Sequence, residues 1–194
     1  MNFLAHIYLS GDDELVRIGN FMGDTIHGHK PDEFPTLIRK GILLHRAIDS
    51  FTDQHPVFRQ STKRLHPTYH HYAGVIVDIF YDHFLAKNFS RDHTTPLADF
   101  AKDFYRSLHD NYDALTERTK NLMPYMIEYD WLTSYQSIEG ISRILVQMDN
   151  RTKNKSGMGH SVNELQEFYA EFEEEFTTFF AELQAFAKEK LQEL

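Results

Sequence analysis

Cysteine is absent from the 194-residue sequence. Its absence excludes disulfide bonds, thiolate nucleophiles and cysteine-based zinc sites, so any metal ion would have to be bound by His, Asp or Glu. No segment approaches the roughly 18 consecutive apolar residues that a membrane-spanning helix requires. The first six residues lack the basic cluster of a secretory signal, and His6 interrupts their apolar character. We therefore expect a soluble, cytoplasmic protein without a membrane partner.

Signature motifs of several enzyme classes are missing as well. The sequence contains no Gly-x-Ser-x-Gly nucleophile elbow, no phosphate-binding P-loop and no glycine fingerprint for dinucleotides. It also lacks the long alternation of apolar and polar residues that would indicate β-strands. The formal net charge of −9 disfavours non-specific binding to nucleic acid.

The residues that are present predict a packed helical domain. Apolar residues make up 41% of the chain, which includes 16 Phe and 10 Tyr, and this length suits one domain with a sizeable core. We predict an all-α fold in which residues 1–194 form a single-domain helical bundle. A final helix with an apolar core face is indicated by three- and four-residue spacing of Leu165, Phe168, Phe172, Phe176, Phe179, Leu183 and Phe186.

The segment from His45 to His55 carries the most chemical information. Because the apolar residues of segment 37–44 indicate a helix already under way, His45, Asp49 and Asp53 occupy positions i, i+4 and i+8 on one face. An imidazole and two carboxylates on one inward-facing stripe suit a metal site. The alternative that this segment leaves open is a solvated helix face with a local His–Asp pair.

Two other segments contain the same residue types. Asp24 follows Gly23 where a predicted helix ends, a place from which a side chain can point into a pocket. Asp78, Asp82 and His83 lie within an apolar helical segment that we place at about residues 67–89. Carboxylates buried there require partners, because an unpaired buried charge is very costly. A metal ion or a facing histidine would supply the partner, whereas a helix with its polar edge in solvent would need neither.

These segments could meet at one metal site, because helices packed in a bundle bring carboxylates and histidines to a common centre. An oxygen-rich site with one or two imidazoles suits Mn²⁺ or Mg²⁺ better than structural zinc. Such an ion polarises a phosphoryl oxygen and lowers the pKa of bound water, so this set of residues favours phosphoester hydrolysis. His6 has two interpretations, either a hydrogen-bonded core histidine or a residue that supports the metal ligands.

Taken together, these motifs resemble a known family. The matching segments are residues 1–6 (Met-Asn-Phe-Leu-Ala-His), Gly23-Asp24 followed by Gly28, Gly41 with His45-Arg46-x-Ile-Asp49-x-x-Thr-Asp53, and Asp78-x-x-x-Asp82-His83-Phe84-Leu85. They are similar to segments of the acyl carrier protein phosphodiesterases and occupy about the first half of the chain.

The resemblance implies an all-α fold related to the HD-domain phosphohydrolases. It also implies Mn²⁺-dependent cleavage of the phosphodiester between 4′-phosphopantetheine and a serine of holo acyl carrier protein, with apo carrier protein and free 4′-phosphopantetheine as products. The carrier protein of this family is small and acidic. A local excess of basic residues would suit such a partner, and it consists of Arg39, Lys40, Arg46, Arg59, Lys63 and Arg64.

Each candidate site residue can then be given an expected role. Mn²⁺ is the expected ion, with Mg²⁺ or another divalent ion as alternatives, and its expected ligands are Asp24, His45, Asp78 and Asp82. Asp49 and His83 are further candidates for binding the ion or supporting its ligands. Asp24, Asp49 and His83 are the candidates for activating the attacking water. Arg46 is expected to bind the phosphate, because a guanidinium matches its geometry.

Two other functions are compatible with the same sequence. The first keeps the metal site and changes the substrate to a nucleotide or another small phosphoester, which only substrate trials would distinguish. The second is a helical adaptor whose acidic stripe forms salt bridges and whose Phe-rich last helix binds a partner helix. The adaptor would bind no stoichiometric metal.

Overall fold

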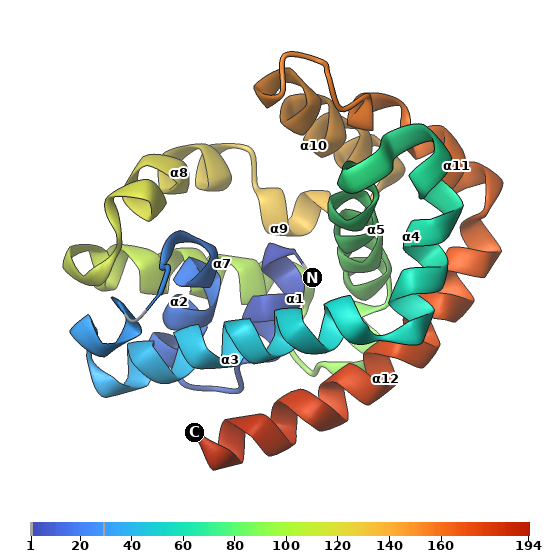
Figure 1. The fold of residues 1–194 in the computed structure, drawn as a ribbon. Coiled ribbons are helices and arrows are strands. Elements are labelled where there is room, and N and C mark those ends of the chain that lie inside the picture. The colour runs from blue at the N-terminus through green and yellow to red at the C-terminus, as the bar shows by residue number, and fades with distance from the viewer. Residues whose placement is uncertain (1, 29) are drawn as a thin grey trace.

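The computed structural model describes residues 2–28 and 30–194, and within these ranges the chain forms only helices and connecting turns (Figure 1). The prediction of an all-α fold is confirmed. The buried apolar residues of the described chain form one core cluster. Among the described residues, no helix combines the length and the apolar character needed to cross a lipid bilayer.

The first half of the chain supplies the long helices that surround the core. The five α-helices are α1 (Phe3–Tyr8), α2 (Glu14–Met22), α3 (Thr36–Gln54), α4 (Pro56–Tyr69) and α5 (Ala73–Lys87). They are interrupted by the short 3₁₀ helices η1 (Gly23–Thr25), η2 (Lys30–Glu33) and η3 (His70–Tyr72).

The second half contains shorter helices and the long C-terminal helix. These elements are α6 (Phe89–Asp92), α7 (Leu97–Asp110), η4 (Tyr112–Ala114), α8 (Glu117–Glu128), α9 (Trp131–Ser134), α10 (Ile138–Arg151), η5 (Met158–His160), α11 (Val162–Glu167) and α12 (Tyr169–Glu193). In Figure 1, α8, α9 and α10 lie across from α3, with α1 between them.

Helices α2 and α3 form the support of the site. The Asp13 carboxylate caps α2 by accepting hydrogen bonds from the backbone N–H groups of Leu15 and Val16. The two helices cross very closely at Gly41, where a Cβ atom would lie only 2.1 Å from the backbone oxygen of Val16. Because α2 continues directly into η1, this close crossing brings Asp24 beside the middle of α3.

The predicted core face of the last helix is confirmed, but the helix itself is divided. Phe172, Phe176, Phe179 and Leu183 are buried in the core. The backbone leaves the helical conformation at Phe168 and so separates α11 from α12. The expected helix over residues 67–89 is also divided. His70 adopts a positive φ of 49°, a conformation that ends α4 before α5 begins at Ala73.

Candidate active site

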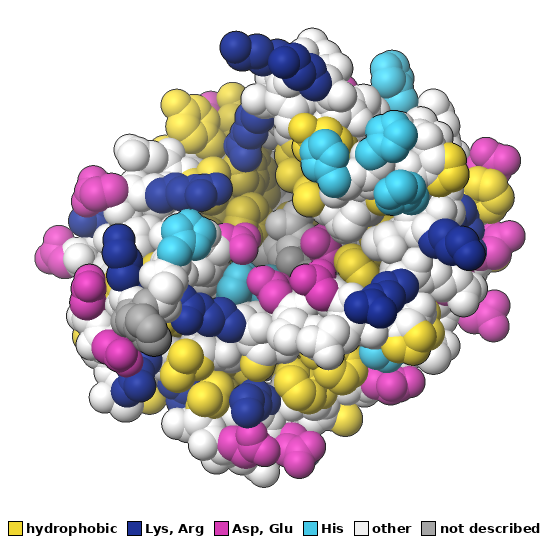
Figure 2. Space-filling view, viewed as in Figure 1, with side chains coloured by type: hydrophobic (Ala, Val, Ile, Leu, Met, Phe, Trp, Pro, Cys, Tyr) yellow, Lys and Arg dark blue, Asp and Glu magenta, His cyan; other side chains and the backbone are white. Residues whose placement is uncertain are grey.

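A cavity of about 360 Å³ lies between α1, α3, α5 and the α8–α10 segment. Figure 2 shows it as a hollow near the centre of that face, with acidic side chains gathered at its edge. Four carboxylates line it, from Asp24 on η1, Asp49 and Asp53 on α3, and Asp78 on α5. Four of the acidic residues that the sequence analysis singled out therefore border one cavity.

The rest of the cavity lining has a different chemistry. Arg118 from α8 and Arg151 from α10 belong to it together with Gln147. Its apolar part consists of Val75, Trp131, Tyr135, Ile144 and Met148. A cavity with an acidic side, an apolar side and two arginines suits an elongated ligand that carries an anionic group.

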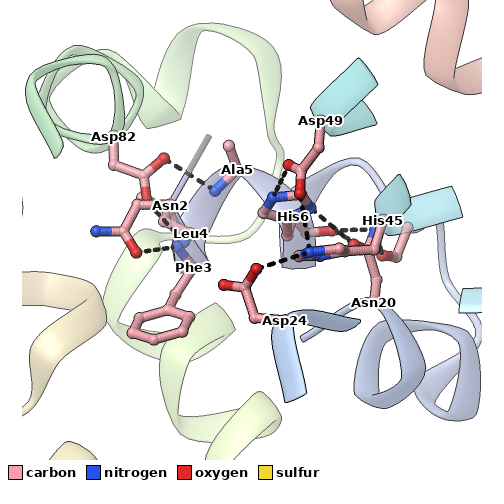
Figure 3. A network of polar contacts seen from close by, with 11 residues as sticks. Asn2, Phe3, Leu4, Ala5, His6, Asn20, Asp24, His45, Asp49 and Asp82 are labelled. Carbon is pink, nitrogen blue, oxygen red and sulfur yellow. Dashed lines mark hydrogen bonds and ion pairs between the residues drawn. The ribbon is translucent and has the colours of Figure 1, made fainter. Parts of the chain in front are cut away.

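His6, His45 and Asp49 meet beside the acidic part of the cavity, where Asp49 belongs to the lining and the two histidines are buried behind it. One ligand atom from each lies within 4.8 Å of the others. The two imidazole rings stack with centroids 4.1 Å apart. The Nε2 atom of His6 lies 3.2 Å from Asp49 Oδ1, and the Nε2 atom of His45 lies 3.1 Å from Asp49 Oδ2 and 3.2 Å from Asp24 Oδ1 (Figure 3).

Asn20 determines the tautomer of His6. The side-chain Nδ2 of Asn20 donates to the backbone oxygen of His6 at 2.9 Å and to Ser10 Oγ at 2.8 Å. Because a carbonyl oxygen can only accept, this contact fixes the orientation of the Asn20 amide, and its Oδ1 faces His6 Nδ1 at 2.8 Å. His6 Nδ1 must therefore carry the proton. Burial and the neighbouring His45 lower the pKa of His6 to about 4, so the ring is neutral at physiological pH.

As a result, the Nε2 atom of His6 presents a lone pair to the cluster. This atom is buried and has no hydrogen-bond partner of acceptable geometry in the described structure, although a carboxylate oxygen of Asp49 lies 3.2 Å away. Two lone-pair atoms at this separation repel each other unless a positive charge lies between them. A histidine whose other nitrogen is held by a hydrogen bond is also the usual arrangement at metal centres. The His6–Asp49 geometry therefore fits a bound cation.

His45 is held in place by the close packing of η1 against α3. A Cβ atom at Gly23 would lie 2.2 Å from His45 Cγ, so only glycine leaves room for the ring. Burial alone would lower the pKa of His45, but hydrogen bonds to Asp24 and Asp49 outweigh burial and raise it to about 9. Without a metal ion, this imidazole therefore carries a proton at neutral pH.

The two carboxylates of the cluster stay ionised. Hydrogen bonding to His45 lowers the pKa of Asp24. Burial opposes ionisation of Asp49, yet the hydrogen bond from His45 holds the pKa of Asp49 well below its ordinary range. Two carboxylates, one imidazolium and one neutral imidazole leave a net negative charge, which attracts a cation. Asp24 is also the most accessible of these groups, with 67% of its side chain exposed.

The comparisons with known proteins identify the family of the chain. The model of the acyl carrier protein phosphodiesterase family matches residues 1–183 of the chain. The chain belongs to this family. It is 29% identical to the acyl carrier protein phosphodiesterase of Pectobacterium atrosepticum, covering 97% of this chain and 98% of that protein. The Yersinia pestis protein of the same name is 28% identical, with 98% and 99% covered. No solved structure matches the chain significantly, so the expected relation to HD-domain phosphohydrolases stays a prediction.

For this member of the acyl carrier protein phosphodiesterase family, Asp78 and Asp82 lie apart from the histidines. Asp78 lines the cavity from α5, and burial raises its pKa. Asp82 is completely buried and accepts hydrogen bonds from the backbone N–H groups of Leu4 at 2.8 Å and Ala5 at 3.2 Å (Figure 3). It therefore binds the N-terminal end of α1 and helps to position His6, which lies two residues beyond Leu4.

His83 and Arg46 are also committed to other contacts. His83 Nδ1 donates to the backbone oxygen of Tyr135 at 2.7 Å, and its Nε2 lies 2.8 Å from the Tyr169 hydroxyl. Both nitrogens are thus used, and the contact with Tyr135 supports a residue of the cavity wall. Arg46 donates to the backbone oxygen of Ile26 at 3.0 Å and is not among the residues that line the cavity.

Several features of the site were not assigned from the sequence. His6 was ambiguous, and its position in the N-terminal motif was the only signal that it had a role. Arg118 and Arg151 carry no motif at all. Two polar atoms in residues that line the cavity, Thr52 Oγ1 and Trp131 Nε1, are buried without a hydrogen-bond partner in the described structure. Such groups are uncommon in folded proteins.

Proposed function

We propose that the protein hydrolyses the phosphodiester that joins 4′-phosphopantetheine to a serine of holo acyl carrier protein. The products would be apo carrier protein and free 4′-phosphopantetheine. The observation that carries the proposal is the neutral, correctly oriented His6 whose Nε2 faces the Asp49 carboxylate at the edge of the cavity. Membership of the acyl carrier protein phosphodiesterase family supports the choice of substrate.

We further propose that a divalent cation, with Mn²⁺ as first choice, is bound by His6, His45 and Asp49. The donor set of two imidazole nitrogens and carboxylate oxygens suits a borderline divalent ion. The accessible carboxylate of Asp24, which lies 3.2 Å from His45 Nε2, would complete the set. When bound, such an ion polarises a phosphoryl group and lowers the pKa of water.

The protein's own residues account for the remaining requirements of hydrolysis. Asp49 contacts both histidines and so holds their rings in a fixed relation. Asp24 lines the cavity and its side chain is largely exposed, which suits its carboxylate to orient the attacking water by a hydrogen bond. The apolar wall formed by Trp131, Ile144 and Met148 can pack against the pantetheine chain and exclude water from one side of it.

The test is incubation of the purified protein with holo acyl carrier protein and Mn²⁺, followed by measurement of the intact carrier-protein mass. Loss of the phosphopantetheine mass with Mn²⁺, and not with EDTA, is the expected result. Asp24→Ala should remove turnover and leave the helical circular dichroism unchanged. An unchanged carrier-protein mass in the presence of bound metal would reject this substrate, and a fully active Asp24→Ala protein would reject the role of Asp24.

A further inference from the structure

Arg118 is fixed close to the acidic side of the cavity by the start of α8. The Thr116 hydroxyl accepts a hydrogen bond from the N–H of Thr119 at 3.3 Å and caps the helix. The same hydroxyl lies 3.1 Å from the hydroxyl of Thr25 on η1. Arg118 and Asp24 also border a second, small cavity of about 40 Å³. The start of α8 therefore packs against η1 through the contact between Thr116 and Thr25. This packing places Arg118 near Asp24.

Arg151 reaches the same space from the end of α10. Its guanidinium carbon lies 5.7 Å from the centre of the Trp131 ring, a distance typical of a cation–π contact. The turn after α10 is held by Asp149, which accepts hydrogen bonds from Ser156 Oγ at 2.7 Å and from the N–H of Gly157 at 3.0 Å. A guanidinium resting on an aromatic face keeps the N–H groups at its edge available for an anion.

Neither guanidinium forms a hydrogen bond or an ion pair with a residue that the structure describes. Among the described residues, Arg118 and Arg151 have no hydrogen bond or ion pair, whereas Arg39 and Arg64 bind Asp32 and Glu175. No ion pair between described residues joins either Arg118 or Arg151 to Asp24 or Asp49, which line the same cavity. Opposite charges thus face one cavity without touching, which leaves room for a group that contacts both sides.

A phosphate between a cation and two arginines fits this arrangement. A divalent ion at the His–Asp cluster would bind the phosphate from the acidic side, and the guanidinium groups match phosphate oxygens in geometry and charge. The cavity itself supplies the second part of the argument, since Arg118 and Arg151 line it together with the carboxylates of Asp24 and Asp49.

We propose that Arg118 and Arg151 bind the phosphate of the substrate in the cavity that borders the His–Asp cluster, and that they select an anionic ester over a neutral one. The identity of the ester rests on the proposed function, whereas the binding of a phosphate does not. Arg46, which the sequence suggested for this role, donates to Ile26 and lies outside the cavity lining.

The first test measures binding and does not depend on the reaction. Inorganic phosphate is titrated calorimetrically into the full-length protein with saturating Mg²⁺. Arg118→Ala and Arg151→Ala should each weaken phosphate binding about 10- to 100-fold, because each removes charge-assisted hydrogen bonds. Arg118→Lys and Arg151→Lys should bind phosphate more tightly than the alanine variants but more weakly than the wild type, since a lysine keeps the positive charge but lacks the paired N–H donors of a guanidinium. Arg106→Ala, which changes the charge equally but removes an exposed pair with Asp103, should bind phosphate like the wild type.

The second test uses holo acyl carrier protein and separates this inference from the proposed function. Both alanine variants should raise KM about tenfold or more and retain the wild-type helical signal. If the wild type does not hydrolyse the carrier protein, the proposed function fails, while the phosphate titration still decides the role of the arginines. Phosphate binding within twofold of the wild type in both alanine variants would overturn the inference.

Discussion

The Nδ1 atom of His6 lies 2.8 Å from Oδ1 of Asn20, and this one hydrogen bond determines which nitrogen of His6 faces Asp49. Asn20 is completely buried on α2, whereas His6 comes from α1. The relation between the two helices therefore sets the protonation of the site as well as its shape. Residues that never touch a substrate can in this way determine whether the cluster binds a cation.

Replacement of Asn20 should weaken metal binding and also lower the stability of the fold. Asn20→Leu removes the acceptor for His6 Nδ1, so both tautomers of the ring become available. We expect Mn²⁺ affinity to fall about 10- to 100-fold and stability to fall by about 1–3 kcal/mol, because buried polar groups lose their partners. Calorimetric titration of Mn²⁺ and urea unfolding measure the two effects.

The matched control is Asn111→Leu, whose side chain donates to Ser107 at the end of α7. It should retain wild-type Mn²⁺ affinity. Equal Mn²⁺ affinity in Asn20→Leu and in the wild type would contradict the orienting role of Asn20.

Gly23 provides a steric test of the same cluster. Gly23→Ala would place a Cβ atom 2.2 Å from His45 Cγ, so the imidazole has to leave its position between Asp24 and Asp49. We expect activity to fall at least tenfold and stability to fall by about 1–3 kcal/mol, as for other overpacked sites.

Gly74→Ala is the appropriate comparison, because a Cβ atom at Gly74 would meet nothing within 4 Å. This residue lies in α5, and alanine favours a helix over glycine by up to about 1 kcal/mol. The variant should be fully active and as stable as the wild type or more so. Matching activity in the Gly23 and Gly74 variants would show that the position of His45 does not matter.

The sequence predicted those parts of the site that depend on local spacing. His45 and Asp49 are four residues apart on one helix, and the structure brings their side chains to 3.1 Å. That contact follows from helix geometry alone. The presence of Asp24 at the same place follows from the end of α2 and the motif around Gly23, and it too was anticipated.

The hydrogen-bond partners of Asp82 could not be predicted from residue spacing. The expectation that a buried carboxylate needs a partner was correct, but the partners are backbone N–H groups of Leu4 and Ala5. Every helix begins with such free N–H groups, so no residue type in the sequence marks them. The tautomer of His6 likewise depends on how α1 packs against α2. Contacts between segments far apart in the chain, including Arg118 and Arg151 at the cavity, could not be obtained from spacing.

The buried Glu175 makes stability depend on pH. Arg64 binds its two oxygens at 2.6 and 2.8 Å, and Ser61 and Gln60 also donate to it. Burial alone would raise the pKa of Glu175, but these hydrogen bonds lower it below its ordinary 4.5. A carboxylate with a lowered folded pKa contributes stability above the unfolded pKa and loses it as pH falls through the folded value.

Glu175→Gln should therefore lower the free energy of unfolding by about 1–3 kcal/mol at pH 7. The difference in unfolding free energy between this variant and the wild type should shrink below about pH 4.5. Urea unfolding between pH 3.5 and pH 7 measures it. Glu117→Gln, which alters an exposed pair with Lys120, should stay within about 0.5 kcal/mol of the wild type throughout. If the unfolding free energies of Glu175→Gln and the wild type differed by the same amount at every pH, the charge of Glu175 would not contribute to stability.

Metal binding itself should appear as stabilisation that depends on Asp49. A ligand at 100 times its Kd that binds only the folded state adds about 2.7 kcal/mol, which for a chain of this size raises Tm by about 5–10 °C. Wild-type protein with Mn²⁺ should show this rise over an EDTA sample. Asp49→Asn should lose it, because Asp49 is the residue that contacts both His6 and His45.

Asp53→Asn gives the sharpest control for that experiment. Asp53 lies one turn further along α3 and lines the same cavity, but it is not part of the His6–His45–Asp49 cluster. Asp53→Asn removes one negative charge from the cavity but no ligand of the cluster, so this variant should keep most of the Mn²⁺-dependent rise in Tm. The comparison separates general attraction of cations by the acidic cavity from binding at the cluster. An equal loss of the rise in both variants would mean that the cavity attracts cations without binding them at the cluster, and a full rise in Asp49→Asn would place the ion elsewhere.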